Sequence, residues 1–364
     1  AQLITVDVAQ LDLLTSAQVQ SLTTGQVQAL TTAQISTLSS VQLVNLDSSQ
    51  VKALTSTQLN VLSSAAIQAI ETADLQAVTS ATLSALSSDQ LNMLSTDQVQ
   101  ALTTGQVRAL TSTQLNRLTS DQLQVVSTVQ VQGLSSTQLN ALTSQTVQAL
   151  TTSTTNGLST TQMQSLGSTL LNRLTTDQVN ALTSTNLRAI STSAMKGVDV
   201  AQLNALSSAQ VQALTTTQIK SLTSAQLNAV NTDQVAQLSS TQASELSSAQ
   251  LNALNSAALQ ALTTDDVQAL TSTQLSQLSS AQLNTLTTDQ VLAISSSALQ
   301  AVSTSAVKAL ATEQLNAMSS AQLQALTTTQ VQALTSSQLN GVDTSQLAAL
   351  NSTQVGALTS AQLN

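Results

Sequence analysis

An eight-residue unit repeats along the chain and constrains the fold more than any other feature of the sequence. The stretch Thr23–Leu30, Thr-Thr-Gly-Gln-Val-Gln-Ala-Leu, represents this octad. With Thr23 as position 1 and Leu30 as position 8, the register runs from Asp7 to Leu358 without an insertion or deletion. Position 8 is Leu, Ile, Val or Met in all 44 complete octads. Fixed-period similarity is typical of a solenoid. We therefore predict a single uninterrupted octad-repeat solenoid over residues 1–364, as a window of a longer array.

Positions 1 and 4 of the octad have the residues of a helix start. Counting Thr359, position 1 is Ser, Thr, Asp, Asn or Gly in 43 of 45 cases, and these residues are preferred at helix N-caps. Position 4 is Gln in 33 of 45 cases, which completes the capping box Ser/Thr-x-x-Gln. We therefore predict one short helix per octad. The predicted N-caps include Thr23, Thr31, Asp47, Asp199, Asn255 and Asp343.

The charged residues indicate the direction of these helices. Of the 17 acidic residues, 15 lie at positions 1 to 4, and all 8 basic residues lie at positions 6 or 7. A helix dipole favours acidic side chains at the N-terminal end and basic ones at the C-terminal end. A β-solenoid, the alternative fold for an octad, gives no reason for this segregation. The favoured fold class is therefore an all-α solenoid of very short helices, with the β-solenoid as its alternative.

The dipeptide Leu-Asn at positions 5 and 6 recurs with a longer period. Successive Asn residues of this dipeptide are three or four octads apart, and the pattern repeats after fourteen octads that contain four such spacings. We infer about three and a half octads per superhelical turn, with Asn along a seam between turns. The candidate seam residues are Asn60, Asn116, Asn172, Asn228, Asn284 and Asn340. The alternative is that duplication of a block of fourteen octads produced the spacing.

The composition argues against most kinds of functional site. The chain has no Cys and no His, so it lacks a thiolate nucleophile, the commonest general base and the commonest metal ligands. It also has no aromatic residue, and its net charge is −9, which argues against binding to nucleic acid. No apolar run is long enough to cross a membrane. We predict no enzymatic activity, no catalytic, cofactor-binding or metal-binding residues, no nucleic-acid partner and no transmembrane segment in this fragment.

Octads of the form Leu-Thr-Thr-x-Gln-Val-Gln-Ala resemble tandem octapeptide-repeat tracts of very large bacterial cell-surface or secreted proteins. The resemblance covers essentially the whole chain and implies an extracellular or cell-surface location. The expected function is structural: an extracellular filament, sheath or stalk that forms by end-to-end or lateral association of the chain with itself. The alternative is a rigid spacer of a bacterial adhesin, with the binding domain outside this fragment. A peptide-binding α-solenoid scaffold has weaker support, because specific binding surfaces use aromatic and Arg anchors. An ice-binding protein also has weaker support, because the position-1 hydroxyls are used as helix caps and short helices make a corrugated face.

Overall fold

A computed structural model describes residues 7–363 of the chain. These residues form 45 short α-helices, one in each octad, and contain no β-strand. The prediction of an all-α solenoid is therefore confirmed, and the β-solenoid alternative is wrong. The chain divides into two compact units, residues 1–191 and residues 192–364.

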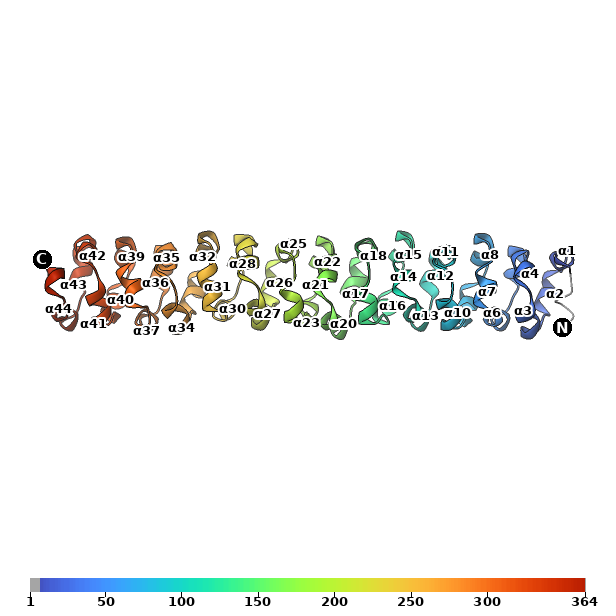
Figure 1. Cartoon of the computed structure of the whole chain (residues 1–364), viewed down its shortest axis with the longest axis horizontal. Helices are drawn as coiled ribbons and strands as arrows, with labels where there is room; N and C mark the ends of the chain where they lie inside the picture. Colours follow the sequence, from blue (N-terminus) through green and yellow to red (C-terminus); the bar gives the residue numbers. More distant parts are fainter. Residues whose placement is uncertain (1–6, 364) are drawn as a thin grey trace. The chain divides into compact units, whose positions relative to one another are not determined.

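Unit 1 contains α1 to α23, which are four to six residues long (Figure 1). Their bounds are α1 Val8–Asp12, α2 Ser16–Gln20, α3 Thr24–Ala29, α4 Thr32–Ser36, α5 Ser40–Leu43, α6 Ser48–Ala53, α7 Ser56–Leu59, α8 Ser64–Gln68, α9 Thr72–Ala77, α10 Ser80–Ser84, α11 Ser88–Asn92, α12 Thr96–Ala101, α13 Thr104–Ala109, α14 Ser112–Leu115, α15 Ser120–Gln124, α16 Thr128–Gln132, α17 Ser136–Asn140, α18 Ser144–Ala149, α19 Thr152–Asn156, α20 Thr160–Ser165, α21 Ser168–Leu171, α22 Thr176–Ala181 and α23 Ser184–Ala189.

Unit 2 contains α24 to α45, which have the same range of lengths. Their bounds are α24 Thr192–Met195, α25 Val200–Asn204, α26 Ser208–Ala213, α27 Thr216–Ser221, α28 Ser224–Ala229, α29 Thr232–Ala236, α30 Ser240–Ala243, α31 Ser248–Ala253, α32 Ser256–Ala261, α33 Thr264–Gln268, α34 Ser272–Ser276, α35 Ser280–Thr285, α36 Thr288–Ala293, α37 Ser296–Leu299, α38 Thr304–Lys308, α39 Thr312–Ala317, α40 Ser320–Ala325, α41 Thr328–Ala333, α42 Ser336–Gly341, α43 Thr344–Ala348, α44 Ser352–Gly356 and α45 Ser360–Leu363.

Each helix begins after position 1 because the backbone there is extended. In the representative octad, Thr23 has φ −72° and ψ 155°, and the helix α3 follows it directly. Leu30 returns to extended geometry, with φ −62° and ψ 135°, while its N–H still donates to the Val27 carbonyl at 3.2 Å. None of residues 7–363 has a positive φ or a cis peptide bond. The chain therefore turns between helices with ordinary residues, which explains why it needs few Gly residues and no Pro.

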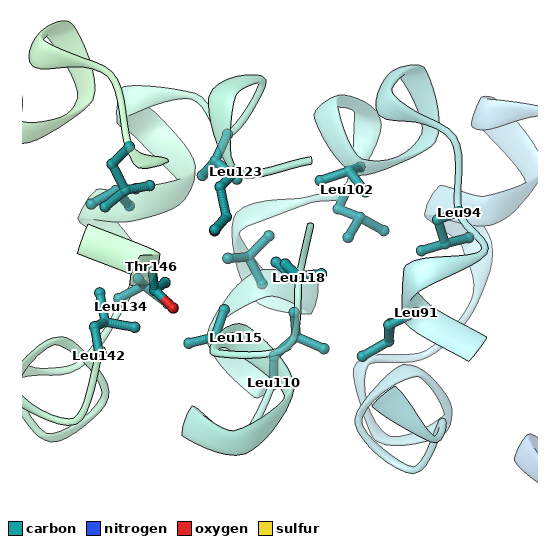
Figure 2. Close-up of a pocket in the computed structure, with 15 residues that line it drawn as sticks. Leu91, Leu94, Leu102, Leu110, Leu115, Leu118, Leu123, Leu134, Leu142 and Thr146 are labelled. Atoms are coloured by element: carbon teal, nitrogen blue, oxygen red, sulfur yellow. The ribbon is translucent and has the colours of Figure 1, made fainter. Parts of the chain in front are cut away.

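The apolar residues at positions 5 and 8 form the core of each unit. In the representative octad, Val27 is 1% exposed and Leu30 is 5% exposed. Figure 2 shows part of the interior of unit 1, where Leu side chains from successive helices point toward one another. The gap among these side chains has a volume of only about 30 Å³, the share of one water molecule in the liquid, and it is lined almost wholly by Leu and Val. This gap is too small for an organic ligand, so we assign the interior to packing.

Residues about three and a half octads apart in the chain become neighbours in successive turns. Helices three octads apart pack against one another, as α6 does on α9 and α10 on α13 in unit 1, and α33 on α36 in unit 2. Side-chain hydrogen bonds also join many helices to the fourth octad before them. In these bonds, the Gln side chain that donates and the backbone carbonyl that accepts are most regularly 28 residues apart in the sequence. A turn of each unit therefore takes about three and a half octads, as the Asn spacing predicts.

Candidate functional site: the amide rungs between turns

The Gln side chain at position 4 joins two helices that belong to different turns. Gln106 Oε1 accepts the Thr103 N–H at 2.8 Å, which closes the capping box of α13. Gln106 Nε2 donates to the carbonyl oxygens of Leu75 and Val78, both at 2.9 Å. These carbonyls lie at the C-terminal end of α9, where C=O groups lack the full set of partners found inside a helix, and the Leu75 carbonyl also accepts the Val78 N–H at 3.1 Å. One buried amide thus satisfies backbone groups at the start of one helix and at the end of another, and we call this contact a Gln rung.

Gln rungs recur through both units with the same spacing. In each of them, Nε2 of the position-4 Gln donates to the carbonyl of the position-8 residue one turn earlier in the chain. The donors include Gln42, Gln50, Gln58, Gln90, Gln98, Gln106, Gln114, Gln122, Gln130, Gln138, Gln162 and Gln178 in unit 1, and Gln226, Gln234, Gln242, Gln250, Gln274, Gln282, Gln290, Gln314, Gln322, Gln330, Gln338, Gln346, Gln354 and Gln362 in unit 2. Because most of these side chains are buried, their hydrogen bonds are made away from competing water.

Shorter side chains can replace Gln in this contact. Asn186 Nδ2 donates to the carbonyl of Leu158 at 3.0 Å, and Thr154 Oγ1 donates to the carbonyl of Val126 at 3.1 Å. Both acceptors lie 28 residues before their donors. A shorter donor at position 4 can therefore make the same contact, although some octads within residues 7–363 have Ala, Leu or Asp there and form no such contact.

The Asn side chain at position 6 forms a second kind of contact between turns. Asn116 Nδ2 donates to the Ala141 carbonyl at 2.9 Å, and Asn116 Oδ1 accepts the Thr143 N–H at 2.8 Å. Ala141 follows the last residue of α17 and Thr143 is the N-cap of α18, so the amide bridges the junction of two consecutive helices. We call this contact an Asn rung.

Three of the other five predicted seam residues make the same contacts. Asn60 joins Ala85 and Ser87, Asn228 joins Ala253 and Asn255, and Asn284 joins Ala309 and Ala311, each through the same pair of hydrogen bonds. Asn172 is half-buried, and Asn340 is exposed. For Asn340, the equivalent partners in the next turn would lie beyond Asn364, where the printed sequence stops.

Asn and Gln are not equivalent at position 6. Gln76 Nε2 donates to the Ala101 carbonyl at 2.8 Å, the same step of 25 residues, but its Oε1 does not take the amide two residues further on. Where Asn284 takes that amide, the position-4 Gln of the next helix loses its donor. The Ala311 N–H bonds to Asn284, and Oε1 of Gln314 is left buried without a partner. This Asn rung therefore replaces a capping-box contact with a contact between turns.

Four of the six predicted N-caps cap their helices through their side chains. Thr23 and Thr31 accept the N–H of the residue three positions later at 3.3 and 3.2 Å, Asp47 does so at 2.8 Å, and Asn255 at 2.9 Å.

For Asp199 and Asp343 the prediction of a side-chain cap is wrong. Both residues hold the N-cap position with an extended backbone, but neither side chain makes the cap hydrogen bond. The N–H three residues later bonds instead to the backbone carbonyl of the N-cap residue, at 3.1 Å for Asp199 and 2.9 Å for Asp343. The first turn is thus closed by the backbone, and this N–H is not donated to the carboxylate.

Titratable groups do not gather into a chemical site in the described part of the chain. Within residues 7–363, no group of three or more acidic residues is placed to hold a metal ion. Lys220 and Glu245 form an exposed ion pair at 3.7 Å. Burial raises the pKa of Asp266, against hydrogen bonds from the side chain and backbone of Thr263 that lower it. The ordered polar groups of the units are thus mainly those of the rungs.

The capping box explains why the Gln side chain accepts a hydrogen bond but not why it also donates one. The residue types at position 4 give an indication of this donor role. A capping box accepts Glu as readily as Gln, and a helix dipole favours Glu in the first turn. Position 4 nevertheless contains no Glu in any octad. Asp occurs there only at Asp74 and Asp266, whereas Gln occurs in 33 of 45 octads. Of these residues only Gln has an N–H₂ group, so the preference for Gln over acidic residues indicates a donor role that the helix itself does not require.

These features define an all-α repeat tract in which side-chain amides join successive turns. The family model of the ALTTAQ repeat matches five segments of this chain, residues 67–104, 181–216, 211–240, 264–296 and 307–342, which confirms a tandem repeat tract. No curated protein matches the sequence. Among residues 7–363, no helix combines the length and the hydrophobicity needed to cross a membrane.

Proposed function

We propose that this chain is a structural segment of an extracellular or cell-surface filament, sheath or stalk, in which copies associate end to end or side by side. The observation that carries the proposal is the use of the buried amides. At octad after octad, these groups join one turn to the next. A ligand site would instead leave convergent polar groups facing a cavity.

The rungs also hold the turns of a unit together, as a segment under tension requires. The turns of each unit are connected by several Gln rungs, with Asn rungs between them, and each hydrogen bond contributes a net ~1 kcal/mol. In a solenoid, stability comes from contacts between neighbouring units of the repeat. Tension along a unit would therefore have to break the rungs of a turn together with its Leu and Val contacts.

The second candidate function is a rigid spacer of a bacterial adhesin. Val129 and Leu292 favour it, because each is an exposed large apolar side chain with no other such residue, among those described, within one turn of it in the sequence. Contiguous apolar patches mark association surfaces, whereas scattered exposed residues are ordinary. A spacer needs cohesion along its length but no lateral interface.

Electron microscopy of the purified 364-residue chain over a range of concentrations separates the two candidates. Fibres of indefinite length support the filament, and separate particles of one length support the spacer. Single-molecule stretching tests what both share, because either function requires resistance to force, and a chain that extends without measurable resistance would overturn both. Antibody labelling of intact cells that produce the protein tests the proposed location.

A further inference from the structure

Asp266 occupies the place of a Gln rung in unit 2 but has no N–H₂ group. Its side chain is 1% exposed. Asp266 Oδ2 accepts the Thr263 N–H at 2.9 Å and the Thr263 hydroxyl at 2.7 Å, so one oxygen closes the capping box of α33. The carbonyl that a Gln rung would reach from here is that of Leu238, the position-8 residue one turn earlier in the chain. Within the described residues, no side-chain donor reaches this carbonyl.

Asn186 in unit 1 provides an equivalent from which we infer the direction of the second oxygen of Asp266. Asn186 has the same shape as Asp266 and also closes a capping box, with Thr183, through its Oδ1. Its other atom, Nδ2, donates to the Leu158 carbonyl one turn earlier at 3.0 Å. By this equivalence, Asp266 Oδ1 is directed at the Leu238 carbonyl. A protonated carboxyl group has an O–H to donate there, whereas a carboxylate has only lone pairs.

We propose that Asp266 is a proton-dependent rung. When the carboxyl group is protonated, Oδ1–H donates to the Leu238 carbonyl and joins α33 to the end of α29; when it is ionised, this contact is lost and two oxygens face each other. Helices α30 and α36 pack against α33. The charged residues on or beside these elements are Asp233 in α29, Glu245 after α30, Asp265 in α33 and Asp289 in α36. All four are acidic, and Glu245 is paired with Lys220.

The direction of the pH effect follows from the burial of the carboxyl group. Burial raises the pKa of Asp266 in the folded unit, with a further increase from Asp265, against the hydrogen bonds from Thr263. The folded unit therefore binds this proton more tightly than the unfolded chain does. The stabilisation is present at low pH and is lost as pH rises through the folded-state pKa.

The test is local hydrogen exchange of the 364-residue chain, measured by mass spectrometry on peptides that cover residues 231–270, at pH 3 and pH 7. Asp266→Asn supplies a permanent donor with unchanged shape. We expect this variant to exchange about fivefold more slowly than the parent chain at pH 7, the effect of one hydrogen bond, and at about the same rate at pH 3. Asp265→Asn is the matched control, because this neighbouring carboxylate is exposed.

Each outcome decides the proposal. A slowing by Asp266→Asn that is confined to pH 7, with little effect of Asp265→Asn, supports it. Equal effects of Asp266→Asn at the two pH values, a faster exchange at pH 7, or the same pH-dependent effect in the control would overturn it. Asp266→Gln provides a second test with the residue found at most position-4 sites, and it should behave as Asp266→Asn does.

Discussion

Replacing Gln106 by Glu separates the two functions of a Gln rung. The substitution keeps an acceptor oxygen for the Thr103 N–H at the start of α13, but it removes the N–H₂ group that donates to Leu75 and Val78 at 2.9 Å. Two donated hydrogen bonds at ~1 kcal/mol each are lost. A carboxylate that faces two carbonyl oxygens in a site only 1% exposed adds ~1–2 kcal/mol. The expected loss of local stability is therefore ~3 kcal/mol at pH 7.

Hydrogen exchange of peptides from residues 71–110 measures this local loss of stability directly. It does not require the unit to unfold in one step, and long repeat arrays often unfold in several. A change of ~3 kcal/mol corresponds to exchange that is roughly a hundredfold faster. Acidification should reverse part of the effect. Burial raises the pKa of a Glu at this site, so the protonated form regains one donor as pH falls.

Gln26→Glu is the matched control for this prediction. Gln26 closes the same kind of capping box with Thr23 at 2.8 Å, but the printed sequence has no position-8 residue one turn before it, and it has no Gln rung. A Glu in the first turn of α3 is compatible with the helix dipole, so we expect a change below ~0.5 kcal/mol. If Gln26→Glu and Gln106→Glu accelerate exchange equally, capping rather than the contact between turns is what stabilises the unit.

Three further substitutions test other contacts. Asn116→Ala removes both hydrogen bonds of the Asn rung and the one that Thr146 Oγ1 donates to Asn116 Oδ1 at 2.9 Å, and it should cost ~3 kcal/mol in local hydrogen exchange. Asn116→Gln keeps only the donated hydrogen bond and should lose about two-thirds of that; equal losses would contradict the distinction between the two amides. Gly133→Ala would bring a methyl group against Thr104 Cγ2, so it should lower the melting temperature, and Thr104→Ser should reduce that loss because it removes the methyl group in contact; a stabilised single variant would show that Thr104 rotates away freely. Thr31→Val removes the N-cap oxygen of α4 and should cost ~1 kcal/mol in denaturant unfolding, and no change would mean that the backbone closes this turn as it does at Asp343.

The sequence predicts the helices and the length of a turn because both depend on local patterns. Thr23 and Gln26 define a helix start through residues three positions apart, and their hydrogen bonds form as the capping box requires. The spacing of Leu-Asn pairs predicts the turn of three and a half octads, because Asn60 and Asn116 each bond to the backbone of a neighbouring turn.

The rungs themselves are harder to predict from sequence because their acceptors are backbone carbonyls. Any residue can supply such an acceptor, so nothing in Leu75 or Val78 marks it as the partner of Gln106. The same reasoning explains the wrong predictions at Asp199 and Asp343. Residue type shows that these side chains can accept a cap hydrogen bond, but only the geometry of the first turn decides whether the side chain or the backbone carbonyl receives the N–H.

The acceptors of the Gln rungs have a consequence for how such tracts can change in length during evolution. Each rung is specified by a place in the octad and a fixed step of 28 residues, and it does not depend on which Leu or Val supplies the carbonyl. Loss or gain of one whole octad by replication slippage therefore leaves every later Gln facing another position-8 carbonyl. A change of any other length would place a different part of the octad there. The gene can thus shorten or lengthen in steps of eight codons without disturbing the bonds between turns.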